Sequence, residues 1–223
     1  MTSCEIDNLC EGGEGPTVTK DLTIGEFTGI DLDISAKVFV TQGESFSVSA
    51  EGQENIINML ELDINNDVWE IEYDETCVGR HNGLTLFITM PEITSLEING
   101  SGEIVSENVI DAPNLDLKIR GSGDMDLALT ASEVDAHIDG SGSMQLEGTA
   151  DDIDVEIHGS GDLKGFDLEV LRADVEIDGS GDVELNVSEF IRVEINGSGD
   201  VFFKGDAELD ETINGSGEVQ RIN

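Results

Sequence analysis

The sequence predicts an all-β protein that folds as a β-solenoid, a stack of parallel coils with about 19 residues in each coil. The first observation is a Gly-Ser-Gly tripeptide that occurs seven times, with 18 to 21 residues between consecutive starts. The second is an alternation of apolar and polar residues on both sides of the tripeptide, which is typical of strands with one buried face. A hairpin around each tripeptide is the alternative, but seven hairpins would each need a facing sheet, so the fixed period favours coils. The tripeptides begin at Gly100, Gly121, Gly140, Gly159, Gly179, Gly197 and Gly215.

The part of the chain before the repeats divides into a leader and a set of degenerate coils. Residues 1–16 contain several glycines and acids and little that could be buried, which predicts a flexible tether. Residues 17–95 are expected to form degenerate coils and a cap, in which Ser35-Ala36 replaces the glycine corner. Proline ends the last of these strands at Pro91, because it cannot donate to a β-ladder. The alternating segments are 30–40, 46–50, 68–73 and 84–88.

A short helix is predicted near residues 53–61, where the N-terminal part breaks the alternation. Ile56, Ile57 and Leu60 stand at helical spacing, and Glu54 lies near a plausible start. A helix here would cover the open end of the solenoid. Terminal repeats need such a cover, since a bare sheet edge invites pairing with other chains.

Residues 96–223 carry the Gly-Ser-Gly coils and are expected to continue the same solenoid without a break. Glycine suits the corners because it reaches backbone conformations that a Cβ forbids, and the middle serine could hydrogen-bond to a neighbouring coil. No obvious second cap follows the tripeptide at Gly215. This end is therefore expected to be guarded by charge or covered by a partner, and self-association into a homo-oligomer would occur there.

The charge balance excludes several kinds of partner. The chain has 50 acidic residues against 10 Lys and Arg, a formal net charge of −40. Nucleic acid is excluded, because phosphate neutralisation needs Lys and Arg, and anionic lipid headgroups are disfavoured for the same reason. Hydrophobic residues make up 38% of the chain and fall in register, so the charge belongs to outward faces rather than to a disordered chain. The sequence has no apolar run of about 18 residues, so it predicts no transmembrane helix.

The three cysteines, Cys4, Cys10 and Cys77, are an odd number and do not describe a disulfide framework. No Cys-x-x-Cys or histidine-rich spacing indicates a zinc site. The segment Thr2-Ser3-Cys4 looks like the tail of a bacterial lipoprotein processing site, with the hydrophobic signal cut away. On this interpretation Cys4 carries lipid in the cell. The alternative is a cytoplasmic protein with a free cysteine near its N-terminus.

Several segments resemble the bacterial head GIN domain family, whose members are named putative auto-transporter adhesins. They are Phe27-Thr28-Gly29-Ile30, Val40-Thr41-Gln42-Gly43, Ile88-Thr89-Met90-Pro91 and the recurring Ile-Asn-Gly-Ser-Gly. The resemblance extends from about Thr17 to Asn223. It implies a single-stranded right-handed parallel β-helix, similar in shape to pectin-lyase-like proteins. It also implies the cell envelope of a Gram-negative bacterium, frequent lipidation, a role in adhesion and no shared catalytic residues.

No group of residues in the sequence predicts catalysis. Lyases of pectin-lyase-like shape need a basic proton acceptor and cations beside the substrate, whereas the Lys and Arg here are scattered over different coils. Glycoside hydrolysis needs a carboxylate pair, but with so many acids such pairs carry no information. His81, His137 and His158 have no Ser or Cys in a nucleophile context. Alternation places His137 outward beside Lys118 or Glu156, as a solvated side chain.

Stacking at this period aligns acids in files along the solenoid. Neighbours in a file would stand about 4.8 Å apart, where like charges repel by roughly 1 kcal/mol per pair in water. Salt, bound cations or a large buried core must offset this repulsion. Calcium takes about six to eight oxygen ligands, so acids after the glycines are weak candidates for binding Ca²⁺, and a solvated acidic surface is the alternative. The files are Asp116, Asp135, Asp154 and Asp174; Glu156, Glu176 and Glu194; and the cation candidates Asp162, Asp182 and Asp200.

Together these features predict a non-enzymatic adhesion or interaction module, lipid-anchored at the outer membrane or cell surface of a Gram-negative bacterium. Its partner would be a surface glycan or protein, and no cofactor is expected. Two alternatives stay open. One is a carbohydrate-active enzyme with a groove along one solenoid face, and the other is a passive scaffold of the envelope.

Overall fold

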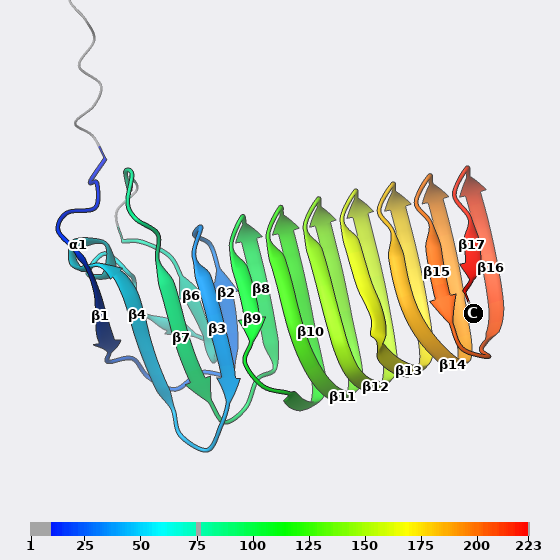
Figure 1. The fold of residues 1–223 in the computed structure, drawn as a ribbon, viewed down its shortest axis with the longest axis horizontal. Coiled ribbons are helices and arrows are strands. Elements are labelled where there is room, and N and C mark those ends of the chain that lie inside the picture. The colour runs from blue at the N-terminus through cyan, green and yellow to red at the C-terminus, as the bar shows by residue number, and fades with distance from the viewer. Residues whose placement is uncertain (1–9, 75–76, 223) are drawn as a thin grey trace, which may run out of the picture.

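A computed structural model describes residues 10–74 and 77–222 and shows one stack of parallel coils along a single axis (Figure 1). The stack makes about seven turns with about 19 residues between stacked strands, which confirms the predicted β-solenoid. The glycine corners follow one another along one edge of the stack, at the upper tips of the arrows in Figure 1.

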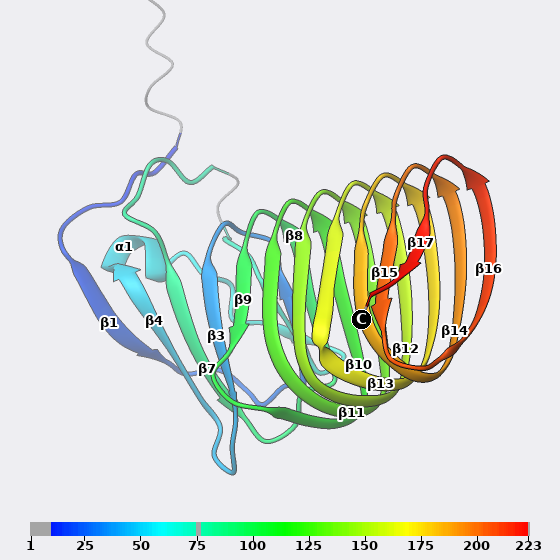
Figure 2. The ribbon, with the colours of Figure 1, turned by 45° about the vertical axis from the view of Figure 1, so that its right-hand side comes forward.

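The repeat coils are built from long strands that bend. Each starts after one Gly-Ser-Gly, turns at the opposite corner, and returns to the next Gly-Ser-Gly (Figures 1 and 2). We call the half after a tripeptide the outgoing face and the half before the next tripeptide the return face. The complete coils are β11 (Asp124–Gly140), β12 (Ser143–Gly159), β13 (Asp162–Gly179) and β14 (Val183–Gly197), preceded by β10 (Ile110–Gly121) and followed by β15 (Val201–Lys204), β16 (Glu208–Gly215) and β17 (Val219–Arg221).

Inward-facing aliphatic side chains fill the space between the two faces. On the return face they form continuous columns, because residues at the same place in successive coils pair in parallel register. Burial of one such side chain contributes about 1.5–3 kcal/mol, so the stacked columns are the main source of stability. One column of fully buried residues runs Ile119, Ile138, Ile157, Ile177, Ile195.

Each glycine corner is held by the corner before it. The Ser160 amide donates to the Gly140 carbonyl at 2.7 Å, and the same bond recurs at the other repeat corners. Gly159 has a φ of +129°, and a Cβ at this position would collide with the Gly140 carbonyl. The corner thus requires glycine both for its backbone conformation and for the close approach of the neighbouring coil.

The N-terminal coils stack in a different order from the sequence. β2 (Gly29–Leu32) lies between β6 and β8, and β3 (Lys37–Gln42) lies between β7 and β9. The later segment formed by β6 (Val68–Ile71) and β7 (Thr85–Met90) is therefore the outermost coil, and the earlier segment is inserted beneath it. β8 (Ser95–Gly100) and β9 (Glu103–Ser106) then continue into the repeats.

Antiparallel strands cover the edges of that outermost coil. β4 (Ser47–Gln53) pairs antiparallel with β7, and β1 (Thr17–Leu22) pairs antiparallel with β4. On the return face β5 (Ile64–Asn65) pairs antiparallel with β6. The parallel edge is thereby replaced by short antiparallel strands, which offer less surface for pairing with other chains.

The predicted helix is present but shorter than expected. α1 spans Glu54–Ile57, a single turn, and buries Ile56 and Ile57. After one turn the chain leaves the helix and pairs with a later segment, where the Glu61 amide donates to the Glu72 carbonyl at 3.0 Å. The fully buried Trp69 also donates its indole N–H to the Glu61 carbonyl at 2.9 Å. The cap therefore consists mainly of antiparallel strands, with the helix as a minor part.

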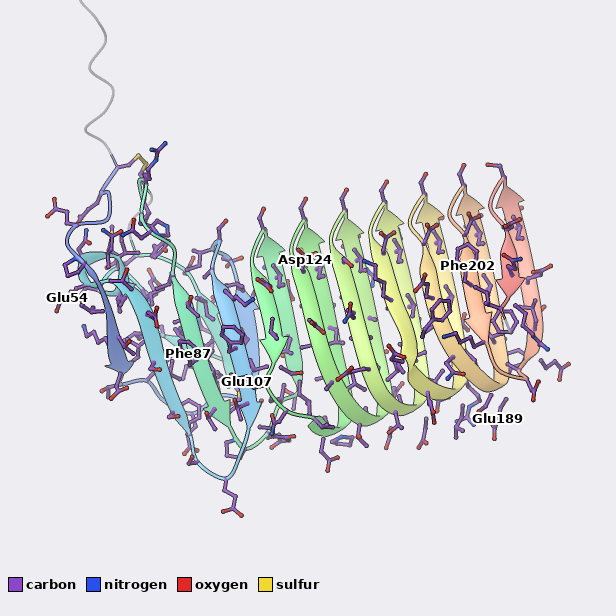
Figure 3. All side chains as sticks on the ribbon, in the orientation of Figure 1. Glu54, Phe87, Glu107, Asp124, Glu189 and Phe202 are labelled. Carbon is purple, nitrogen blue, oxygen red and sulfur yellow. A yellow bond between two sulfur atoms is a disulfide. The ribbon has the colours of Figure 1, made fainter. Side chains whose placement is uncertain are left out.

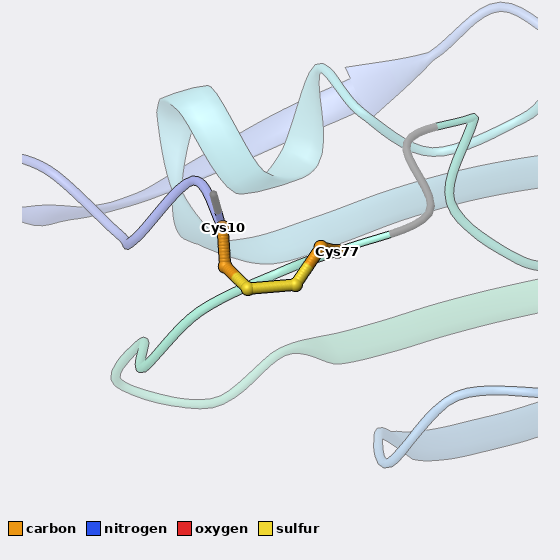
Figure 4. Close-up of a disulfide and its surroundings, with 2 residues drawn as sticks. All are labelled: Cys10 and Cys77. Carbon is orange, nitrogen blue, oxygen red and sulfur yellow. A yellow bond between two sulfur atoms is a disulfide. The ribbon is translucent and has the colours of Figure 1, made fainter. Parts of the chain in front are cut away.

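A flexible tether was expected over residues 1–16. Residues 1–9 lie outside the described residues, and residues 10–14 are tied to the cap. Cys10 forms a disulfide with Cys77, with their Cα atoms 4.6 Å apart (Figure 4). The Glu11 amide also donates to the Cys77 carbonyl, and the Gly13 amide donates to the Arg80 carbonyl. Two of the three cysteines are thus paired, against the expectation from their odd number. Cys4 lies outside the described residues.

The opposite end of the stack is open in the part of the chain that the structure describes. β16 pairs only with β14, and β17 pairs only with β15. Glu211 occupies the inward column of β16, in register with the buried Val193. Within the described residues, no helix is long and apolar enough to cross a membrane.

Candidate functional site

A groove of about 770 Å³ runs across five coils at the corner opposite the glycines. It is formed where β10 to β14 bend, at the lower edge of Figure 1. Four spacings between five strands give it a length of about 19 Å. Its floor is low because small side chains occupy the bend at three successive coils, namely Ala112, Ala131 and Ala150.

One file of polar side chains runs along this groove, one from each coil. The parallel register places these residues directly beside each other. Hydroxyl, amide and carboxylate groups thus recur at about 4.8 Å intervals above the alanine floor. From β10 to β14 the file is Asp111, Thr130, Thr149, Glu169 and Asn186.

The ends and rim of the groove are fixed by specific contacts. The Gln42 side chain accepts from the Asp111 amide at 2.6 Å and donates to the Asp111 carbonyl at 3.0 Å, which anchors the first coil. The Leu171 side chain is 37% exposed and adds apolar surface to the rim of the groove. The adjacent Arg172 donates two hydrogen bonds to the Asp152 carboxylate, each 2.7 Å long. The charge of Arg172 is neutralised by Asp152, so the net charge of the groove stays negative.

The outgoing face carries outward-facing aromatic residues. Phe39 and Phe87 stack with ring centroids 5.4 Å apart, and Lys37 lies over the Phe39 ring. Figure 3 shows Phe87 and Phe202 on this face. Phe39 and Phe87 belong to adjacent coils, so their stacking reinforces the solenoid as well as presenting apolar surface.

The return face bears the acidic files that the period predicts. The register confirms the alignment of Asp116, Asp135, Asp154 and Asp174, and of Glu156, Glu176 and Glu194. Partial burial, together with the charges of Asp174 and Glu156, raises the pKa of Asp154. In the next coil Arg192 replaces an acid and donates to Asp174 at 2.9 Å.

The cation candidates Asp162, Asp182 and Asp200 stand in one file beside the glycine corners, but their oxygens are partly engaged. The Asp182 amide donates to Asp162 Oδ1 at 3.1 Å, and the Asp200 amide donates to Asp182 Oδ1 at 3.0 Å. Earlier coils use a glycine carbonyl for this bond, as where the Asp162 amide donates to Gly142. The side chains therefore substitute for backbone acceptors where the ladder is interrupted.

Among the described residues, two other groups bring three metal-ligating side chains together. Asp31, Asp33 and Glu70 form the first. Burial, with the charges of Asp33 and Glu70, raises the pKa of Asp31 to about 6, although Asn99 donates to it at 2.7 Å. The second group is His137, Asp139 and His158. His137 faces outward, with Lys118 and Glu156 beside it in the register, as predicted.

The sequence profile of the family described as "Putative auto-transporter adhesin, head GIN domain" matches residues 26–207. The chain belongs to this family. No match was found among curated proteins.

Solved structures of similar fold come from Bacteroides fragilis and from Parabacteroides species. A protein of Bacteroides fragilis named a putative adhesin matches with a TM-score of 0.89 and 24% identity, over 95% of this chain and 99% of that chain. A putative adhesin of Parabacteroides distasonis has a TM-score of 0.81 and 20% identity, with coverage of 95% and 99%. Another protein of that species, named a putative lipid binding protein, has a TM-score of 0.77, 20% identity and the same coverage. At this identity the likeness supports the fold alone.

Sequence reasoning found the acidic files but missed the groove. The file from Asp111 to Asn186 consists of ordinary polar residues that no motif marks. A signal was nonetheless present, because Thr130 and Thr149 stand at the same offset from their tripeptides and are each followed by alanine.

Proposed function

We propose that this protein is a non-enzymatic adhesion module of the bacterial envelope that binds a surface ligand along the groove across β10 to β14. The observation that carries the proposal is the polar file above the alanine floor, which repeats hydrogen-bonding groups along five coils. A linear ligand with its own repeat could contact successive coils in the same way. The family name supports an adhesive role.

A neutral glycan fits the groove better than a charged one. Hydroxyl, amide and carboxylate side chains bind sugar hydroxyls, while Leu171 and the alanines offer apolar contact. The net charge of −40 and the acids Asp151 and Glu169 repel polyanions. A protein surface with matching hydroxyl or amide groups is the second occupant that this chemistry admits.

The disulfide supports a location outside the cytoplasm. Bonds such as Cys10–Cys77 form and persist in oxidising compartments, including the periplasm and the cell surface. We extend the proposal to a lipid anchor on Cys4, six residues before the disulfide, which would hold the capped end of the solenoid towards the membrane. Mass spectrometry of the protein from its native host tests this, since acyl groups must then be found on Cys4.

A glycan array probed with purified protein tests the ligand. Thr149→Arg places a long side chain in the middle of the groove, and Gln145→Arg adds the same charge to the outgoing face of the same strand. We expect Thr149→Arg to abolish binding to the glycans recognised by the unaltered protein, while Gln145→Arg retains it. Equal binding by both variants would refute the groove as the site. Failure to bind any glycan or envelope component would refute the adhesion module.

The enzyme alternative has its own readout. Products from any bound polysaccharide, lost in Asp151→Asn or Glu169→Gln, would place the molecule among carbohydrate-active enzymes instead. Both carboxylates lie in the groove, so the same purified variants serve for binding and for turnover.

A further inference from the structure

We propose that His137, Asp139 and His158 bind one Zn²⁺ ion on the return face of the solenoid, outside the groove. The three side chains come from two adjacent coils, β11 and β12. Their candidate ligand atoms all lie within 4.8 Å of one another. Three protein ligands with a fourth position left open is a common arrangement for zinc that meets an external ligand.

The register of the coils creates this group. His137 and Asp139 are two residues apart on β11 and therefore project from the same face. His158 pairs directly with Asp139 across the ladder, and Glu156 pairs directly with His137. Asp139 thus stands between the two imidazoles. His158 Nδ1 lies 3.3 Å from Asp139 Oδ1, and His137 Nε2 lies 3.8 Å from Asp139 Oδ2.

The separations fit a zinc ion after small side-chain rotations. Zinc–nitrogen and zinc–oxygen bonds of about 2.0–2.1 Å in tetrahedral geometry place ligand atoms about 3.4 Å apart. The two separations to Asp139 are 3.3 and 3.8 Å, and the imidazole nitrogens lie within 4.8 Å of each other. The three side chains are 30–45% exposed, which leaves them room to turn. The backbone ladder holds their Cα atoms in place, so little ordering is needed on binding.

The far nitrogen of each imidazole faces a carboxylate, which is a second and independent feature of metal-binding histidines. His137 Nδ1 lies 2.8 Å from Glu156 Oε2, and His158 Nε2 lies 3.8 Å from Asp178 Oδ2. Such carboxylates fix the ring orientation and increase the basicity of the nitrogen that binds the metal.

The neighbouring cations do not compete for the group. Lys118 and Arg120 lie in the coil before, next to His137 and Asp139 in the register. Lys118 donates instead to Asp116 at 2.7 Å, and Arg120 pairs with Glu97 and Asn99. Lys118 and Arg120 are therefore paired with other residues and not with the histidines. The mixed nitrogen and oxygen ligands favour zinc over Ca²⁺ or Mg²⁺, which prefer oxygen ligands alone.

Isothermal titration of tag-free, metal-stripped protein with Zn²⁺ tests this proposal. We expect one ion per chain, with binding lost in His158→Gln and in Asp139→Asn. His81→Gln removes the histidine outside the group and is expected to bind as the unaltered protein does. Glu156→Gln should weaken binding about tenfold while keeping one ion per chain, because Glu156 positions His137. Glu176→Gln, in the same file one coil further on, should leave the affinity unchanged.

Two outcomes would overturn the site. One is Zn²⁺ binding of equal affinity in the unaltered protein and in a His137→Gln/His158→Gln double variant. The other is binding of Ca²⁺ or Mg²⁺ with the affinity of Zn²⁺, which would indicate general attraction to an acidic surface. Thermal melting of every variant guards against misfolding, and these outward side chains are expected to leave the melting temperature within a few degrees. Because the groove is on another part of the coil, glycan binding can fail while this site stands.

Discussion

At the scale of single residues, the same position in successive coils is under the same physical constraint, and this explains the repetition in the sequence. Ile157 must fill the interior, Gly159 must adopt a positive φ, and Ser160 must donate its amide to the coil before. Outward positions face only neighbours in the ladder, so acids, histidines and arginines can exchange there. Individual chemistry therefore appears on the faces, while the corners and the interior stay uniform.

Gly159→Ala is predicted to destabilise the fold by about 2 kcal/mol or more. A residue with a Cβ is strained at a φ of +129°, at a cost of about 1–3 kcal/mol, and the new methyl group would also press on the Gly140 carbonyl. Urea unfolding of the oxidised protein measures the difference. Ser160→Ala is the matched control, since the exposed hydroxyl can be lost without changing the backbone bond. Equal stability of the two variants would contradict this account of the corner.

Asp31→Asn is predicted to stabilise the protein at pH 7–8. Burial, followed by the charges of Asp33 and Glu70, raises the pKa of Asp31 from its ordinary value near 3.8 to about 6. The folded state therefore binds this proton more tightly than the unfolded state. Its stabilising effect is complete below pH 3.8 and is lost as the pH rises through 6.

The expected gain from Asp31→Asn is about 1 kcal/mol above pH 7, because solvent screens a half-exposed carboxyl. The asparagine can still accept the hydrogen bond from Asn99. Unfolding at a series of pH values should show a smaller loss of stability between pH 4 and pH 6 than in the unaltered protein. Asp126→Asn removes one charge from an exposed site on the other face. An unchanged pH profile in Asp31→Asn would contradict the assignment.

At the scale of elements, the repeats were predictable and the cap was not. Each repeat strand pairs with the strand one repeat further along the chain. The repeat length in the sequence therefore predicts which residues pair from β10 to β14. β2 instead pairs with β8, whose partner residues lie 66 positions further along the chain, and with β6 on its other side. No local pattern encodes that insertion. The alternation within each strand is the same for either order of stacking.

The helix and the disulfide illustrate the same limit. The apolar residues of this segment have helical spacing, but the helix ends after one turn because the next residues pair with a later segment, Leu60 with Tyr73. Cys10 and Cys77 are 67 residues apart, and an odd total of cysteines concealed the pair. If Cys4 carries lipid, only Cys10 and Cys77 remain. Two remaining cysteines would have predicted the disulfide between them.

The candidate sites were partly predictable for a related reason. Asp139 and His158 are 19 residues apart, so the period alone places them side by side. A search for local zinc motifs cannot find them, because the spacing belongs to the coil and not to a helix or a hairpin. The depth of the groove depends on how β10 to β14 bend, which the sequence does not show.

At the scale of the whole molecule, the two ends of the solenoid differ in how they avoid pairing with other chains. Antiparallel strands and α1 close the first end, where β1 is the outer strand on one face. At the other end the β16 edge is bare within the described residues, and Leu209 and Ile213 lie near it. At this end the charge of Glu211 opposes pairing of β16 with another chain. Glu211 points along the inward column that Val175 and Val193 fill in earlier coils, and burying it against another chain would require its desolvation.

Glu211→Val is predicted to make the protein self-associate through β16. The substitution completes the apolar column and removes the charge that opposes docking, so two copies can pair their β16 edges about a two-fold axis. Sedimentation at increasing concentration should show a dimer, favoured by salt because screening weakens the repulsion between two chains of charge −40. Asp210→Val makes the same exchange at an outward position and is expected to stay monomeric under the same conditions. Closed dimers are expected rather than fibres, because antiparallel strands cover the other end. Filaments would show that the β1 edge also pairs, and a monomeric Glu211→Val would show that Glu211 does not guard this end.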